Sequence, residues 1–270
     1  MAILKGYRIM KKMNLNLGGG ASRSLKAFTL AEVLITLAII GVVAALTIPS
    51  VITNYKNTQT STALKKAYST LASTTNLAIK DHGPISSWDI IEGDATVEKS
   101  KDFVDKYIIP YLRISKNCGL RTSDDCKFEF RYYNDPQVYK LGGSFTRFYL
   151  ADGTFVGIYA RNKNGRVRAQ VNIDVNGQKG PNKFGVDIFP FDYLIKRNEA
   201  YPGKLIPVCN YDDNGNCAIE DSLSDSVNSN GCNKDETGGY CSHVIMANGW
   251  KIPSKEEYVN MGGEADKYPW

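Results

Sequence analysis

The sequence predicts an α+β protein in which a long N-terminal helix, membrane-spanning in its first half and amphipathic in its second, packs on an antiparallel sheet. Three observations support this class: an apolar run at 28–48, helically spaced apolar residues continuing to residue 78, and strand-like alternation with tight turns within 127–194. All six cysteines follow the apolar run and predict a disulfide-stapled C-terminal region. The expected divisions are a basic leader, a transmembrane helix, a globular domain and a cysteine-rich region, at 1–27, 28–52, 53–197 and 198–270.

The leader carries positive charge only. Its six basic residues are Lys5, Arg8, Lys11, Lys12, Arg23 and Lys26. Positive charge beside a hydrophobic helix stays on the cytoplasmic side, so we expect the bulk of the chain to lie outside the membrane. An ordinary secretory signal peptide has the same order of segments and would be cut near Val43-Ala44-Ala45. The apolar run, however, is longer than the usual signal core, and it contains an acid.

The apolar run has the length of a membrane span. Residues 28–46 are apolar except for Thr29, Glu32 and Thr36. A helix over 28–48 would measure ~32 Å at ~1.5 Å per residue, which is enough to cross a bilayer. A carboxylate in such a helix is costly, so it is expected to be functional and to have a partner. The alternative is an uncleaved membrane anchor with an incidental acid.

The start of this run resembles the cleavage motif of type IV prepilins and type II secretion pseudopilins. The string is Lys26-Ala-Phe-Thr-Leu-Ala-Glu32. In that family a peptidase cuts before the aromatic residue and methylates the new amine, and glutamate is the fifth mature residue. The resemblance therefore places the cut between Ala27 and Phe28 and makes Glu32 the fifth residue. The family usually has glycine before the cut; alanine is also small, so we expect slower or still competent cleavage at Ala27.

Two further positions match this family in register. Gly41 and Pro49 occupy the fourteenth and twenty-second mature positions, where the family tends to have a helix-loosening glycine and a proline. A free α-amine is largely protonated at neutral pH. The resemblance thus implies that Glu32 neutralises the amine of Phe28 in an adjacent subunit and sets the axial step between subunits. Residues 28–52 would then be a transmembrane helix before assembly and a filament-core helix afterwards.

The resemblance also implies a pilin-like fold, a location and a set of partners. Before assembly the subunit would be a single-pass protein of the inner or cytoplasmic membrane, in contact with lipid. After assembly it would belong to a filament at the cell surface or in the periplasm. The implied partners are other pilin subunits, a prepilin peptidase, an assembly ATPase and an inner-membrane platform protein.

The second half of the helix has one apolar face. Its helically spaced residues are Leu64, Ala67, Tyr68, Leu71, Leu77 and Ala78. Pro49 removes one backbone hydrogen bond and is expected to kink the helix. The string Asp81-His82-Gly83-Pro84 is expected to end it. A helix of this length suits an anchor that leaves the membrane and packs one face against a sheet.

The strands follow a second amphipathic segment at 98–114. Alternating or apolar runs predict strands at 127–133, 145–150, 154–159, 167–175 and 187–194. Turn sequences lie at Ala151-Asp152-Gly153 and at 162–165. Sequential strands joined by tight turns form an antiparallel meander.

The loop over 174–187 is the best candidate for a cofactor site. Asp174, Asn176, Asn182 and Asp187 bring side-chain oxygens together with several glycines. Calcium takes six to eight oxygen ligands, so these four residues and nearby carbonyl groups could hold a Ca²⁺ ion. Some pseudopilins bind calcium in a loop of the C-terminal half, although this sequence matches no calcium-loop pattern residue by residue. The alternative is a loop shaped by Gly, Pro and Asx turns without an ion.

The cysteines are Cys118, Cys126, Cys209, Cys217, Cys232 and Cys241. Their spacing makes local pairs the simplest arrangement: 118–126, 209–217 and 232–241. A zinc site is weakly supported, because the chain has no Cys-x-x-Cys and its only histidines are His82 and His243. The polar segment 198–242 has few large apolar residues and is expected to rely on its disulfides. Beyond it, Trp250 is expected to pack back on the domain, with ligand stacking as the alternative.

The charge balance argues against a nucleic-acid-binding domain. The leader holds six of the 33 basic residues and none of the 28 acidic ones, so the mature chain has 27 basic and 28 acidic residues. Arg161, Lys163, Arg166 and Arg168 gather around one predicted turn. Such a cluster could touch DNA phosphates, but a solvated turn is the simpler explanation.

The sequence contains no Gly-x-Ser-x-Gly, phosphate-loop or His-Glu-x-x-His motif, so we expect no enzyme. Three functions remain open. The first is a filament subunit. The second is a minor pilin or surface adhesin that binds cells or DNA through 198–242. The third is an exported domain with an ordinary signal anchor.

Overall fold

The computed structural model describes residues 28–89, 96–120, 126–142, 144–163, 166–196, 204–211, 216–225 and 228–270. The protein is α+β and pilin-like, with a long N-terminal helix, an antiparallel sheet and three disulfides. By its internal packing the chain divides into two units, one ending at Ser50 and the other comprising Val51–Trp270. Helix α1, Leu30–His82, contributes residues to both.

The remaining helices are short. They are α2 (Val97–Tyr107), α3 (Ile219–Leu223), α4 (Cys241–Ala247) and α5 (Lys255–Asn260), with 3₁₀ turns at Ile85–Ser87, Ile109–Tyr111, Gly177–Lys179 and Ala265–Lys267. The strands are β1 (Ile114–Gly119), β2 (Glu129–Phe130), β3 (Tyr139–Lys140), β4 (Thr146–Leu150), β5 (Phe155–Lys163), β6 (Arg166–Asp174), β7 (Ile188–Lys196) and β8 (Leu205–Pro207).

The main sheet is a six-stranded antiparallel meander with the order β1-β4-β5-β6-β7-β8. The predicted turn between β4 and β5 forms: Gly153 has a φ of +89°, and the Asp152 carboxylate accepts a hydrogen bond of 3.1 Å from the amide of Thr154. The strand predicted at 127–133 shrinks to β2, which pairs only with β3 in a two-stranded sheet. The sequence pattern missed β1 and β8, which are the edge strands of the main sheet.

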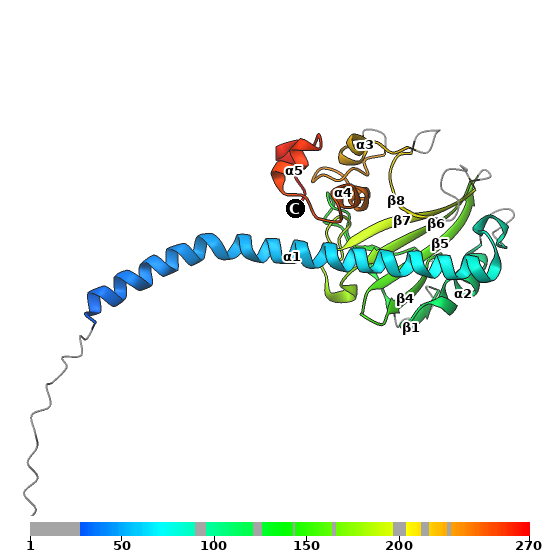
Figure 1. Cartoon of the computed structure of the whole chain (residues 1–270), viewed down its shortest axis with the longest axis horizontal. Coiled ribbons are helices and arrows are strands. Elements are labelled where there is room, and N and C mark those ends of the chain that lie inside the picture. Colours follow the sequence, from blue (N-terminus) through cyan, green and yellow to red (C-terminus); the bar gives the residue numbers. More distant parts are fainter. Residues whose placement is uncertain are drawn as a thin grey trace, which may run out of the picture. The chain divides into compact units, whose positions relative to one another are not determined.

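The second half of α1 covers one face of the main sheet (Figure 1). Leu64, Leu71 and Ala78 are fully buried and share a core cluster with side chains of β4 to β7. Hydrogen bonds lock this interface. The hydroxyl of Thr75 donates to that of Tyr193 over 2.9 Å, and the Tyr193 hydroxyl donates to the carbonyl of Leu71 over 3.2 Å. The helix ends as predicted, because Gly83 follows it with a φ of +80°.

Helix α4 packs beside β7 and β8, α3 packs on α4, and α5 lies beyond them at the C-terminal end of the chain (Figure 1). Val244 and Ile245 of α4 and Tyr258 of α5 are buried and belong to the same core cluster as the sheet. In the apolar stretch at 244–252, α4 extends to Ala247, and Asn248 and Gly249 follow it as a turn in which Gly249 has a φ of +67°. Trp250 packs back on the domain as expected, with its ring centroid 4.8 Å from that of Tyr68 in α1.

Candidate functional site

Thr29 caps the N-terminus of α1. Its backbone amide and its hydroxyl donate hydrogen bonds of 2.8 and 2.9 Å to the carboxylate of Glu32, and the amide of Glu32 donates to the Thr29 hydroxyl over 3.2 Å. This reciprocal pattern is a capping box, whose Thr-x-x-Glu signal was present in the sequence. Phe28, just ahead of the cap, is 85% exposed. Ala27, on the other side of the predicted cut, lies outside the described residues.

The segment of α1 within Leu30–Ser50 is apolar on all sides. Its exposed large apolar residues are Leu30, Val33, Leu34, Ile35, Leu37, Ile39, Ile40, Val42, Val43, Leu46 and Ile48. Length and composition make α1 a candidate membrane span. Pro49 lies inside the helix, and a Cβ added at Gly41 would meet no atom within 4 Å. A helix that is hydrophobic all round is stable only when lipid or other helices cover it.

The loop over 174–187 brings together all four residues predicted to supply oxygen ligands. Two of them bind the loop's own backbone through hydrogen bonds, and two do so only in part. The carboxylate of Asp187 accepts hydrogen bonds from the amides of Asn182 (2.9 Å) and Lys183 (2.6 Å) and from Nδ2 of Asn176 (3.2 Å). The side-chain oxygen of Asn182 accepts a bond of 3.0 Å from the amide of Gly180. Asp187 and Asn182 therefore fix the shape of the loop.

Each of the other two predicted ligand residues, Asp174 and Asn176, has one side-chain oxygen that is free to bind a cation. Oδ2 of Asp174 and Oδ1 of Asn176 are buried and accept no hydrogen bond from the described residues. Burial, with a contribution from the nearby charge of Asp187, raises the pKa of Asp174 to about 8. Burial also raises the pKa of Asp187. Two unpartnered buried oxygens beside a second carboxylate fit a cation, since either a proton or a metal ion would relieve the repulsion.

Three disulfides join Cys118 to Cys126, Cys209 to Cys217 and Cys232 to Cys241. They differ in exposure. The pair from Cys232 to Cys241 is fully buried, and the pair from Cys118 to Cys126 is nearly so. Cys209 and Cys217 are half-buried. These are the local pairs that the spacing made simplest.

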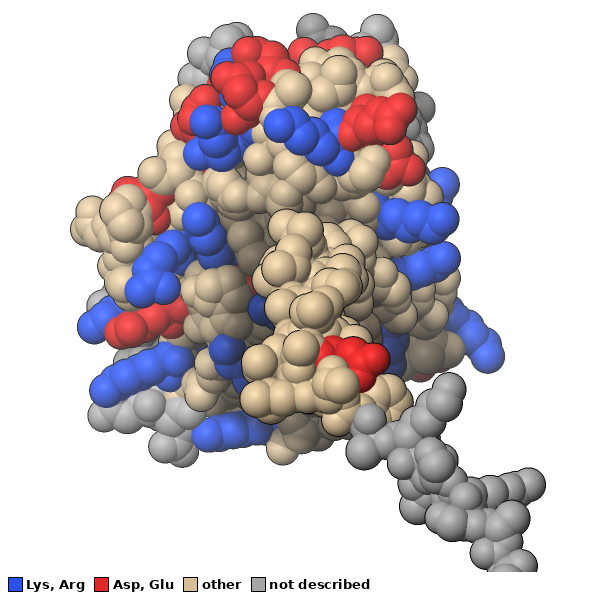
Figure 2. Space-filling model, turned by 90° about the vertical axis from the view of Figure 1, so that its left-hand side faces the viewer, with Lys and Arg blue, Asp and Glu red and all other residues tan. Residues whose placement is uncertain are grey.

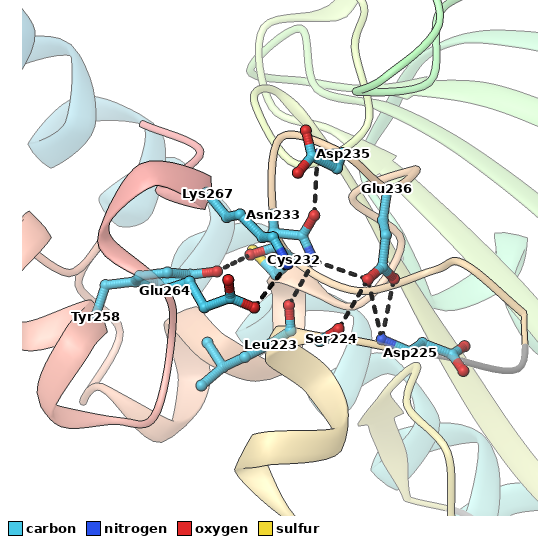
Figure 3. A network of polar contacts seen from close by, with 10 residues as sticks. All are labelled: Leu223, Ser224, Asp225, Cys232, Asn233, Asp235, Glu236, Tyr258, Glu264 and Lys267. Carbon is cyan, nitrogen blue, oxygen red and sulfur yellow. Dashed lines mark hydrogen bonds and ion pairs between the residues drawn. The ribbon is translucent and has the colours of Figure 1, made fainter.

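A hydrogen-bond network around Glu236 organises the cysteine-rich region (Figure 3). The Glu236 carboxylate accepts bonds from the amides of Asp225 (3.0 Å) and Gly231 (2.6 Å) and from Nδ2 of Asn233 (2.8 Å). Nearby, the Tyr258 hydroxyl donates to the carbonyl of Cys232 over 3.0 Å. Sequence reasoning missed this role of Glu236, because two of its partners are backbone amides, which no residue pattern reveals.

Of the four basic residues predicted around the β5–β6 turn, Arg168 has a described side chain, whereas those of Arg161, Lys163 and Arg166 lie outside what the structure describes. Arg168 is ion-paired over 3.0 Å with Asp192, whose side chain is 4% exposed. Burial raises the pKa of Asp192 to about 7, although the charge of Arg168 opposes this shift. Acidic and basic side chains are interspersed on the face of the protein drawn in Figure 2.

Comparison with known proteins gives two matches, which lie side by side along the chain. Residues 50–258 match the model of a family of unknown function (DUF6613). Residues 23–48 match the model of the prokaryotic N-terminal methylation motif. Neither the curated proteins nor the solved structures yielded a match.

Proposed function

Because this chain belongs to the family of unknown function that its residues 50–258 match, and because a prokaryotic N-terminal methylation motif precedes that region, we propose that it is a structural subunit of a type IV pilus-like or type II secretion pseudopilus filament. At the family level the motif makes it a type IV pilin-like, prepilin-type protein. Such proteins have structural rather than enzymatic roles. The observation that supports this proposal most is a helix that is apolar on all sides over its first half and has a single carboxylate in its first turn.

Processing would create the partner that this carboxylate needs. A cut between Ala27 and Phe28 leaves a new amine one residue ahead of the Thr29 cap. In a single subunit the Glu32 carboxylate is already held by Thr29. In a filament the charged amine of a neighbouring Phe28 would neutralise Glu32, which a neutral cap donor cannot do. The ion pair between Glu32 and the neighbouring amine favours assembly over the lone subunit, because each charge would otherwise lie in an apolar environment without an opposite charge beside it.

Assembly then follows from the surface of α1. The exposed apolar residues of Leu30–Ser50 are covered by lipid before assembly and by the same segment of neighbouring subunits afterwards. Identical head-to-tail contacts that do not close generate a helical filament. A prepilin peptidase, an assembly ATPase and a membrane platform protein are the partners that this route requires.

We further propose that the loop over 174–187 binds Ca²⁺. The open oxygens of Asp174 and Asn176 and the second lone pairs of Asp187 would hold the ion, with backbone carbonyls or water completing its shell. The ion would supply positive charge between two buried carboxylates. It would thereby rigidify the connection between β6 and β7.

Mass spectrometry of the mature N-terminus tests the filament proposal. In cells with a prepilin peptidase, we expect a chain that begins at N-methylated Phe28. The Glu32→Ala variant should be processed yet absent from sheared filaments, whereas Lys56→Ala serves as a control with a matched change on the same helix. A mature chain that starts near Leu46, or normal incorporation of the Glu32→Ala variant, would refute the proposal.

A further inference from the structure

Three chain segments bring soft-metal ligands together around the Cys209–Cys217 disulfide. Cys209 follows β8, Cys217 precedes α3, and His243 lies in α4. The two sulfur atoms and a ring nitrogen of His243 all lie within 4.8 Å of one another. Sγ of Cys217 is 3.5 Å from Nδ1 of His243, and the hydroxyl of Ser222 in α3 lies 2.7 Å from the same nitrogen.

We propose that reduction of the Cys209–Cys217 disulfide opens a zinc site formed by the two thiolates and Nδ1 of His243. Tetrahedral zinc with Zn–S of ~2.3 Å and Zn–N of ~2.0–2.1 Å places sulfur and nitrogen ligands ~3.5 Å apart. Cys217 and His243 already have this spacing. Two thiolates on one zinc lie ~3.8 Å apart by the same geometry, so breaking the disulfide provides the separation that the ion needs.

The other two disulfides lack what this site has. Cys232 and Cys241 are fully buried, and Cys118 and Cys126 are nearly so, which limits the access of reductants and ions to both disulfides. His82, the second histidine of the chain, packs edge-on against Tyr107 and Tyr111. Only at Cys209 and Cys217, within the described residues, does a disulfide that is not fully buried lie beside an imidazole. Two thiolates and one imidazole form a donor set that zinc prefers.

The chemistry balances with a dithiol or phosphine reductant. Two electrons from the reductant break the S–S bond, and the reductant is oxidised to a cyclic disulfide (dithiol) or to a phosphine oxide (phosphine). The two protons that complete the thiols come from the dithiol itself, or from the water molecule that gives the phosphine its oxygen. Zinc then displaces both thiol protons, because it binds only thiolates. The hydroxyl of Ser222, 3.5 Å from Sγ of Cys217, can turn from His243 to that thiolate. The disulfide form offers no thiolate and so binds no zinc. Redox state therefore gates the site, and its fourth position stays open to water.

Cobalt binding to the full chain in detergent tests the proposal. After reduction with a phosphine, we expect one equivalent of Co²⁺ with thiolate-to-cobalt charge-transfer absorption that Zn²⁺ removes. The oxidised protein should show none. The His243→Gln variant should bind about tenfold more weakly or worse, while His82→Gln should match the unmodified chain. Equal binding by oxidised and reduced protein, or unchanged binding by His243→Gln, would overturn the proposal.

A second variant removes the need for a reductant. Cys209→His cannot form the disulfide and leaves the other two disulfides intact, yet it keeps three ligands for the ion. We expect it to bind Co²⁺ with one thiolate, and Zn²⁺ to protect Cys217 from alkylation. If Cys209→His and the reduced protein both fail to bind Co²⁺ while their circular dichroism shows folded protein, the site does not exist.

Discussion

The carboxylate of Glu32 accepts hydrogen bonds of 2.8 and 2.9 Å from the backbone amide and the hydroxyl of Thr29. The acid that a filament would use is therefore not without a partner in the single chain. The helix cap donates hydrogen bonds to the Glu32 carboxylate, but Thr29 is neutral and so does not neutralise the negative charge. These two properties of Glu32 can be separated by mutation.

The Glu32→Gln variant should keep the cap and lose the charge, because glutamine also serves in a capping box. We expect the variant to be inserted and processed but to stay out of filaments, as does Glu32→Ala. Counting subunits in sheared filaments by immunoblot measures this. Normal incorporation of Glu32→Gln alongside failure of Glu32→Ala would assign assembly to the cap rather than to the charge.

Leu71 and Leu77 provide a matched pair on α1. Leu71 is fully buried against the sheet, and Leu77 is 49% exposed. Leu71→Ala should lower the free energy of unfolding by about 2–5 kcal/mol, since it leaves a cavity in a packed core. Leu77→Ala should change it by about 0.5 kcal/mol or less. Denaturant unfolding of the full chain in detergent measures both, and equal effects would contradict the packing of α1 on the sheet.

The stability of the cation-free protein should depend on Asp174. The pKa of Asp174 is about 8 in the folded chain and about 3.9 in an unfolded one. At pH values between these two pKa values, Asp174 holds a proton in the folded state that it has lost in the unfolded state. This carboxyl therefore destabilises the fold progressively as pH rises from about 4 to about 8.

The Asp174→Asn variant should remove this pH-dependent destabilisation, because asparagine does not titrate. At pH 8 without Ca²⁺, we expect the variant to melt above the unmodified chain by about 2–4 °C for each 1 kcal/mol gained. Adding Ca²⁺ should raise the melting temperature of the unmodified chain and leave Asp174→Asn unchanged. The exposed Asp221→Asn variant is the control and should keep the calcium response. An identical response in all three proteins would rule out the proposed calcium site.

Glu236 should contribute more to the stability of the fold than is usual for a glutamate near the surface. Glu236→Gln weakens charge-assisted hydrogen bonds to the amides of Asp225 and Gly231, and we expect a loss of about 1–3 kcal/mol. Glu264→Gln removes an exposed ion pair with Lys267 and should cost far less. Limited proteolysis of the C-terminal region reports the difference. Equal protease resistance in both variants would show that the hydrogen bonds of Glu236, drawn in Figure 3, do not hold the region.

The sequence predicted the α+β class, the bounds of α1 and the central strands because each rests on local periodicity. Apolar spacing in α1 and alternation in β4 to β7 are properties of consecutive residues. The edge strands β1 and β8 carry little of this signal, since β1 is mostly exposed and β8, although buried, is only three residues long. Helix α4 was missed for another reason. It is short, and its burial depends on β7 rather than on its own sequence.

The predicted residues of the loop over 174–187 were brought together, but their roles were not predictable. Which carboxylate binds backbone amides and which stays open depends on the path of the loop. In the same way, nothing in the chain order links His243 to Cys217, 26 residues before it.

The one-dimensional order of residues by itself determined an apolar helix with a lone acid, an N-terminal methylation motif at its start, and a sheet behind it. These follow from short-range chemistry, which each segment carries wherever it is placed. Tertiary structure alone decided which buried oxygens lack hydrogen-bond donors and which cysteines lie beside a histidine. Such contacts join segments that only the folded core brings within bonding distance.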